Sequence, residues 1–126
     1  MIVADTSYII EAILRKAVFL RGEVLITPDL ALYKAVNTIW KHETLIQDLK
    51  NAEEYLNIIE KLISTETITL IRPDSKLIQQ AYYLSLKHKT PFYDTVFITL
   101  ALKLKLDLKT FDKTQIKILS EETKGS

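Results

Sequence analysis

The chain has 126 residues, of which 48% are hydrophobic and 26% are charged, and its formal net charge is +1. These values predict a single globular domain, residues 1–126, that buries a core without staples, and the absence of cysteine excludes disulfides, zinc–thiolate sites and cysteine nucleophiles. No stretch reaches the roughly 18 apolar residues of a membrane span and the first residues lack the pattern of a signal peptide, so we expect a cytoplasmic protein with no membrane contact.

The first seven residues, Met1-Ile2-Val3-Ala4-Asp5-Thr6-Ser7, are an apolar run that ends in an acid and two hydroxyl residues. A short apolar run followed by helix-like sequence is typical of a buried strand in a parallel sheet. Functional groups in open α/β sheets lie at the carboxyl ends of the strands. We therefore predict that the chain is organised around the carboxylate of Asp5.

The rest of the chain alternates helical and strand patterns, which predicts an α/β fold with a small central parallel sheet and helices on both faces. The run from Val96 to Leu102 is apolar on all sides, so its helix should lie in the core. The helix that starts at Pro28 should bury Leu32, Val36, Ile39 and Trp40, and leave Lys34, Asn37 and Lys41 on its polar side. In the first half of the chain we predict a helix capped by Ser7 that runs to about Lys16, a strand over Val24–Thr27, a helix from Pro28 to about His42, a polar turn over 43–50 and a helix over Asn51–Ile63. In the second half we predict a strand over Thr67–Ile71, a helix capped by Asp74 or Ser75 that runs to about Lys87, and a helix over Phe92–Lys105. A strand over Asp107–Thr110, a short helix over Lys113–Leu119 and a frayed tail over 121–126 complete the chain.

Three acids stand at strand ends or helix starts: Asp5, Asp94 in Pro91-Phe92-Tyr93-Asp94, and Asp112 in Thr110-Phe111-Asp112. Each has a structural explanation, as a helix cap or a partner of the helix dipole. All three together at such positions favour a shared site. Clustered carboxylates repel each other and raise each other's pKa values unless a hard cation neutralises them, and oxygen ligands favour Mg²⁺ or Mn²⁺.

These motifs resemble the PIN-domain family, and within it the VapC-type toxin ribonucleases of archaea and bacteria. The resemblance rests on strand-Asp-Thr-Ser, on Pro-x-Tyr-Asp before an apolar helix, on strand-Thr-x-Asp, and on Leu-Tyr-x-x-x-Asn-x-x-Trp-Lys in the second helix. It implies a Mg²⁺- or Mn²⁺-dependent endoribonuclease that hydrolyses RNA phosphodiester bonds, is inhibited by a small antitoxin and forms a homodimer. By the same resemblance, the catalytic and metal-binding residues are Asp5, Asp94 and Asp112, and the supporting residues are Ser7, Thr110, Asn37 and Lys34.

Lys34 departs from the family pattern, because it stands where the family has a glutamate. The change takes the formal charge of the site from −4 to −2, and a unit-charge pair about 4 Å apart is worth roughly 4 kcal/mol at an effective dielectric near 20. Lys34 could pair with Asp5 or Asp94 in place of a metal, or extend into solvent. Glu11 and Glu43 lack the spacing to substitute for the glutamate.

Two interpretations of the function therefore stay open. In the first, the chain is an active toxin ribonuclease. In the second, Lys34 leaves metal binding weak or absent, and the chain is an RNA- or antitoxin-binding module with little or no catalysis. Exposed apolar residues near Tyr55, Tyr82 and Tyr83 are candidates for a dimer face.

Three other classes of protein fit the sequence less well. Response-regulator receivers need an acidic pair after the first strand, and phosphatases need Asp-x-Asp, whereas Thr6 and Ser7 follow Asp5. Phosphate-binding loops need glycines, and Gly22 is the only glycine before Gly125. The scarcity of glycine, the lack of cysteine and the abundance of Ile, Leu, Lys and Glu also predict a thermophilic source.

Overall fold

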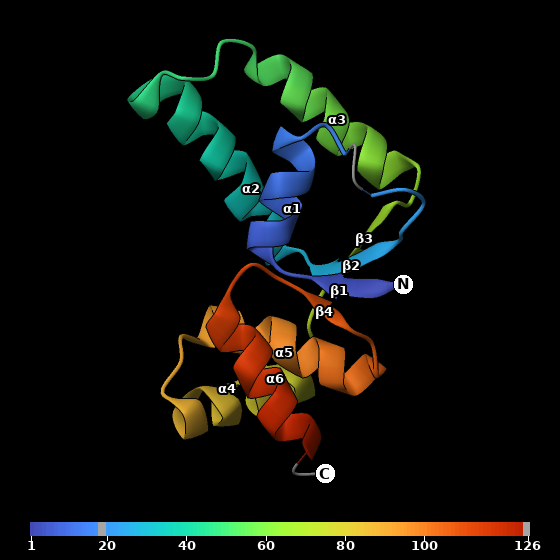
Figure 1. The fold of residues 1–126 in the computed structure, drawn as a ribbon, viewed down its shortest axis with the longest axis vertical. Helices are drawn as coiled ribbons and strands as arrows, with labels where there is room; N and C mark the ends of the chain where they lie inside the picture. The colour runs from blue at the N-terminus through green and yellow to red at the C-terminus, as the bar shows by residue number, and fades with distance from the viewer. Residues whose placement is uncertain (18–19, 125–126) are drawn as a thin grey trace.

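A four-stranded parallel sheet lies at the centre of the residues that the structure describes, 1–17 and 20–124 of a computed structural model. The strands are β1 (Ile2–Ala4), β2 (Leu25–Pro28), β3 (Ile68–Ile71) and β4 (Leu108–Lys109), in the order β3-β2-β1-β4. The helices are α1 (Thr6–Leu14), α2 (Leu30–Lys41), η1 (His42–Ile46), α3 (Ala52–Ser64), α4 (Ser75–His88), α5 (Phe92–Leu104) and α6 (Lys113–Lys124). Helices α1, α2 and α3 cover one face and α4, α5 and α6 the other (Figure 1), which confirms the predicted α/β fold.

Each face of the sheet has its own core, because successive strand residues point to opposite sides. Ile2 and Ala4 of β1 pack in the cluster that contains α1, α2 and α3. Val3, between them, packs in the cluster that contains α4 and α5. Residues 95–101 of α5 are all buried, as predicted for a core helix. Among the described residues, no helix is both long and apolar enough to cross a membrane.

The strand order creates a switch point between β1 and β4. From β1 the chain moves through α1 to β2 on one side, whereas β4 pairs with β1 on the other side. Connections leave the two neighbouring strands in opposite directions, so a crevice opens at their carboxyl ends. The residues that follow β1 and β4, beginning with Asp5 and Thr110, therefore meet at this point.

Four predicted boundaries differ from those in the structure. Asp5, rather than Ser7, is the N-cap of α1, because its carboxylate accepts a hydrogen bond from the Tyr8 N–H at 3.0 Å. Pro28 ends β2, where it pairs with Ile71, and does not begin α2. Residues 43–50 are not simply a turn, since α2 continues into the π-helical turn η1. Strand β4 is two residues long, shorter than predicted.

The buried face of α2 also differs from the prediction. Ala31, Ala35 and Ile39 face the core, whereas Trp40 is 52% exposed and Val36 lies at the surface. Alanines four residues apart leave room for α2 to lie close to α1, so the larger apolar side chains lean outward. Apolar periodicity alone counts large residues as core and undervalues alanine.

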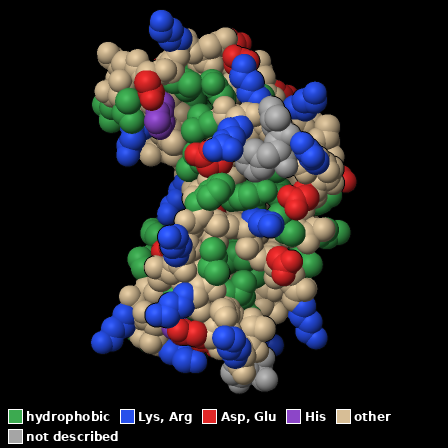
Figure 2. All heavy atoms as spheres, viewed as in Figure 1, with side chains coloured by type: hydrophobic (Ala, Val, Ile, Leu, Met, Phe, Trp, Pro, Cys, Tyr) green, Lys and Arg blue, Asp and Glu red, His purple; other side chains and the backbone are tan. Residues whose placement is uncertain are grey.

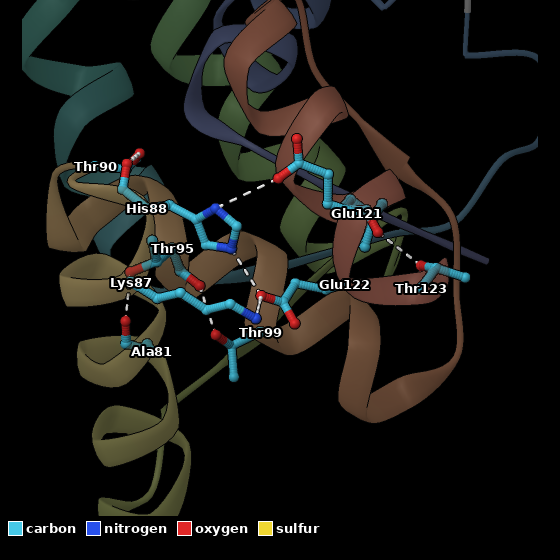
Figure 3. Close-up of polar contacts among 10 residues, drawn as sticks. Ala81, Lys87, His88, Thr90, Thr95, Thr99, Glu121, Glu122 and Thr123 are labelled. Carbon is cyan, nitrogen blue, oxygen red and sulfur yellow. Dashed lines mark hydrogen bonds and ion pairs between the residues drawn. The ribbon is translucent and has the colours of Figure 1, made fainter. Parts of the chain in front are cut away.

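The C-terminal helix is longer than predicted, because polar side chains attach it to α4. Residues 121–124 are helical rather than frayed, and 125–126 lie outside the described residues. The ring Nε2 of His88 lies 2.7 Å from Glu122 Oε1, and Lys87 Nζ lies 3.0 Å from the same oxygen (Figure 3). Glu121 lies on the other side of the ring, 3.6 Å from Nδ1.

Replacement of Glu122 with glutamine should destabilise the protein more at neutral pH than at acid pH. The hydrogen bond from His88, and then that from Lys87, lower the pKa of the Glu122 carboxyl. A lowered pKa in the folded state stabilises the protein above the unfolded-state pKa, and this stabilisation is lost as the pH falls through the folded-state pKa. We expect a loss of about 0.5–1 kcal/mol, or roughly 2–4 °C in Tm, at pH 7 and a smaller loss at pH 3. Thermal melts at both pH values, with Glu53→Gln on exposed α3 as the control, test this; an equal deficit at both values contradicts it.

Candidate active site at the carboxyl edge of the sheet

Asp5 is the centre of a hydrogen-bonded cluster and is only 2% exposed. Its Oδ1 accepts from Ser7 Oγ at 2.7 Å and from the Tyr8 N–H at 3.0 Å. Its Oδ2 accepts from Thr110 Oγ1 at 2.5 Å and from Gln115 Nε2 at 3.1 Å. A buried carboxylate is tolerated only when its oxygens are paired in this way, so the surrounding residues hold Asp5 in a fixed orientation.

The register of the sheet explains why Thr110 reaches Asp5. Ala4 pairs with Lys109, so the residues that follow these two lie side by side at the carboxyl edge. The hydroxyl of Thr110 also accepts from the Asp112 N–H at 2.9 Å. The hydrogen bond between Thr110 and Asp5 thus joins the loop after β4 to the start of α1.

Asp94 lies in the first turn of α5 and is half-buried. Its Oδ1 accepts from Gln115 Nε2 at 3.4 Å, and the same amide nitrogen donates to Asp5. Burial, and then the negative charge of Asp112, raise the pKa of the Asp94 carboxyl; the charge of Asp5 adds to the rise, and Lys34 and Gln115 act against it. Two of the three predicted acids therefore accept hydrogen bonds from the same amide nitrogen.

Asp112 stands at the rim rather than between the other two acids. Its Oδ1 accepts from the Thr114 N–H at 2.9 Å, so it caps the start of α6. Among the described residues, no three acidic or histidine side chains converge closely enough to hold a metal ion by themselves. The structure thus brings Asp5 and Asp94 together and leaves Asp112 close enough to act on Asp94 through its charge.

Sequence reasoning missed Gln115, although it is 2% exposed and connects the two acids. It lies on the inward face of α6, with Ile118 one turn later. A polar residue three positions after Asp112, in line with an apolar residue of the same helix face, was the available signal. Such a residue needs buried polar partners, and the three acids of the predicted site were available as partners.

Lys34 makes no ion pair with Asp5 or Asp94, contrary to one of the two predicted roles. Its Nζ lies 4.1 Å from the centre of the Tyr93 ring, which is a cation–π contact. It still lowers the pKa of Asp94 through its charge. Lys34 and the exposed Asn37 line a shallow hollow of about 460 Å³ together with Thr6, Tyr33 and Thr38.

The other two acids considered as substitutes lie elsewhere. Glu11 forms an ion pair with Arg15 at 3.1 Å, four residues along α1. Glu43 is exposed on η1. Neither Glu11 nor Glu43 therefore replaces the family's glutamate, and Lys34 occupies that position.

Comparison with curated proteins identifies the family. Ribonuclease VapC3 of Pyrobaculum aerophilum is 30% identical to this chain over 93 residues, which cover 74% of this chain and 70% of that protein. The chain belongs to the VapC ribonuclease family. No family model matches the sequence. The crystal structure of PAE2754 from the same organism matches the fold of this chain with a TM-score of 0.75 and 17% identity, over 92% of this chain and 82% of that one, which supports the fold alone.

The site of this VapC chain has the donor atoms that suit a hard divalent cation. Asp5 and Asp94 supply carboxylate oxygens, and Gln115 Oε1 is buried without a hydrogen-bond partner among the described residues. Mg²⁺ and Mn²⁺ prefer such oxygen ligands. The amide of Gln115 contacts both carboxylates through Nε2, and because the two ends of an amide are nearly equal in shape, it could present its oxygen to a cation at the same place.

Proposed function

We propose that this chain is a Mg²⁺- or Mn²⁺-dependent endoribonuclease of the VapC toxin type that hydrolyses RNA phosphodiester bonds. The observation that carries the proposal is the pair of carboxylates, Asp5 and Asp94, bridged by one amide at the switch point of a VapC-family sheet. Ligands bind at such switch points in open parallel sheets. The oxygen donors around the pair match the cation that the proposal needs.

Each polar side chain has a role in this proposal. Asp5 and Asp94 hold the cation, which when bound supplies Lewis acidity for the attack of water on phosphorus. Ser7 and Thr110 keep the Asp5 carboxylate in place through their hydroxyl groups. Asp94, beside Asp5 at the edge of the sheet, would also accept a proton from the attacking water. Asp112, at the rim, adds negative charge beside Asp94, which favours a cation at this site.

Exposed aromatic rings beside the acids favour single-stranded RNA. Tyr93, next to Asp94, is 52% exposed, and Phe111, next to Asp112, is 59% exposed and stacks on Tyr8 at 5.8 Å between ring centres. Unpaired bases stack on such rings. Lys and Arg side chains are scattered over the face in Figure 2 rather than gathered in one stripe. Stacking, with Lys34 as a nearby cation, therefore fits better than a broad electrostatic track for duplex RNA.

Cleavage of RNA with and without metal tests this function. The purified protein should cut a single-stranded RNA in Mn²⁺ or Mg²⁺, stop in excess EDTA and recover when the metal is restored. Cleavage that persists at full rate in EDTA would contradict the metal-dependent mechanism. A protein that never cuts, but retains RNA, would favour the second candidate below.

The second candidate function is a binding module without strong catalysis, and Lys34 is the observation that favours it. The lysine replaces a carboxylate and puts a positive charge close enough to act on Asp94. An apolar groove of about 620 Å³ between α2 and α3, lined mainly by Leu32, Val36, Leu56, Ile59 and Ile63, is the kind of surface that receives apolar side chains of a partner helix, such as one of an antitoxin. Binding of such a partner does not depend on the acids, so this candidate keeps the toxin–antitoxin pair and loses the reaction.

We also propose that the protein forms a homodimer through α4. Tyr82 and Tyr83 are exposed on this helix, together with Ile78 and Leu86. Tyr55, the third predicted dimer residue, instead packs against the core on the other face of the sheet. Contiguous exposed apolar residues mark interaction surfaces, and sedimentation analysis of the protein with and without Tyr83→Glu tests the assignment.

A further inference from the structure

The amide of Gln115 is unusual because half of it is satisfied and half is not. Nε2 donates to Asp5 Oδ2 at 3.1 Å and to Asp94 Oδ1 at 3.4 Å. Oε1 is buried and has no hydrogen-bond partner among the described residues. The side chain comes from α6, whereas Asp5 follows β1 and Asp94 lies in α5. Three separate elements thus converge on one small group of polar atoms.

The spacing of these atoms resembles that of ligands around one cation. Adjacent oxygens of a Mg²⁺ octahedron, with metal–oxygen distances of about 2.0–2.1 Å, are about 2.9 Å apart. The longer bonds of Mn²⁺ widen this spacing. The amide atom that faces the carboxylates lies 3.1 and 3.4 Å from them, close to these values. The two ends of an amide are nearly equal in shape, so a half-turn about its terminal bond exchanges oxygen for nitrogen without other movement.

We propose that Gln115 supplies an amide oxygen ligand to the divalent cation of this site and replaces the carboxylate that is lost at Lys34. The inference rests on the metal-dependent function proposed above. Without the cation, Nε2 faces the two carboxylates and keeps them from repelling each other. With the cation, the amide would turn so that Oε1 faces the metal, and Nε2 would take the buried place that Oε1 has now.

A purely structural role explains these observations less well. A packing role would be filled by leucine, which has a similar size and no polar atoms. A hydrogen-bonding role alone accounts for the contacts of Nε2 with the two carboxylates and gives the buried Oε1 no use. The site has two close carboxylates and a nearby lysine, so a cation there would need a further oxygen ligand. The amide oxygen of Gln115 would supply one.

Mn²⁺ calorimetry on Gln115 variants tests the proposal. Gln115→Leu should bind Mn²⁺ at least tenfold more weakly than the wild type, and Gln115→Glu, which adds a charged oxygen at the same place, should bind at least as tightly. Gln79→Leu, on the exposed surface of α4, is the matched control and should bind like the wild type. Circular dichroism of each variant shows whether the fold is retained.

A second measurement on the wild type does not depend on the variants. On addition of diamagnetic Mg²⁺, the side-chain amide resonances of Gln115 in a nitrogen-15 spectrum should shift, while those of Gln79 should not. Wild-type affinity in a folded Gln115→Leu variant, or an unmoved Gln115 signal at saturating Mg²⁺, overturns the inference. If Asp94→Asn alone abolishes Mn²⁺ binding, the proposed metal site stands and only the role of Gln115 fails. If the wild type binds no Mn²⁺, both proposals fail.

Discussion

Replacement of Asp94 with asparagine should reduce RNA cleavage at least a hundredfold. A positioned acid or base contributes about 10²–10⁴-fold to a rate, and Asp94 is proposed both to hold the cation and to accept a proton. The asparagine keeps the shape of the side chain and an oxygen for Gln115 Nε2, which donates to Asp94 Oδ1 at 3.4 Å. The change therefore removes the charge and leaves the surrounding contacts.

The same substitution should leave the metal-free protein as stable as the wild type or more stable. Burial and the charge of Asp112 raise the pKa of Asp94, so its ionised form is disfavoured in the fold at neutral pH. Asparagine has no charge to repel Asp112 or Asp5. A higher or equal Tm in EDTA, combined with lost cleavage, would separate a chemical role from a folding role, as expected where function is kept at a cost to stability.

The measurement is the initial rate of cleavage of a single-stranded RNA in Mn²⁺, with Asp107→Asn as the control. Asp107 is exposed and lies just before β4, so it changes the net charge by the same amount away from the site. The control should cut at the wild-type rate. An Asp94→Asn protein that cuts as fast as the wild type would show that the nuclease activity comes from elsewhere.

The fold could be predicted because its signals are local and repeated. The apolar run before Asp5 and the β-branched run of β3 both predicted strands that the structure has. The apolar middle of α5 predicted a core helix, which its burial confirms. Alternation of strands and helices then leaves few topologies other than a parallel sheet. Errors are confined to the ends of elements and to the face of α2, where alanine gives little hydrophobic signal.

The arrangement within the candidate site was harder to predict than its location. Asp5 and Asp94 lie close together because parallel strands and the core helix bring their ends to one edge, which sequence order can indicate. Asp112 makes a backbone cap with Thr114 instead, a local bond that competes with any distant partner. Gln115 contacts Asp94 and Asp5, which lie 21 and 110 positions earlier in the chain, and such distant contacts cannot be read from local periodicity.

Replacement of Lys34 with glutamate should raise the affinity for Mn²⁺ at least tenfold and increase RNA cleavage. The formal charge of the group formed by Asp5, Asp94, Asp112 and position 34 changes from −2 to −4. At an effective dielectric near 20, unit charges about 8 Å apart interact by roughly 2 kcal/mol. A change of two charge units near a divalent cation can therefore raise the affinity for Mn²⁺ more than tenfold, even without direct contact between the residue at position 34 and the cation. Position 34 need not move, because Lys34 already acts on the pKa of Asp94.

The metal-free Lys34→Glu protein should be less stable than the wild type, although it binds metal more tightly. It loses the contact of the ammonium group with the Tyr93 ring, 4.1 Å from its centre, and gains repulsion from Asp94. Saturating Mn²⁺ should therefore raise its Tm by more than that of the wild type, since a ligand stabilises in proportion to its affinity. A lower Tm without metal and a larger rise in Tm with Mn²⁺ distinguish tighter metal binding from a general effect on folding.

Two matched variants separate the causes of the gain at position 34. Lys34→Gln removes the positive charge without adding a carboxylate and should give an intermediate Mn²⁺ affinity. Lys41→Glu makes the same charge change on the exposed end of α2 and should leave the affinity close to that of the wild type. Calorimetric titration of all four proteins decides the question. Equal affinities for wild type and Lys34→Glu would mean that position 34 does not reach the cation, and the lysine would then be no obstacle to catalysis in this chain.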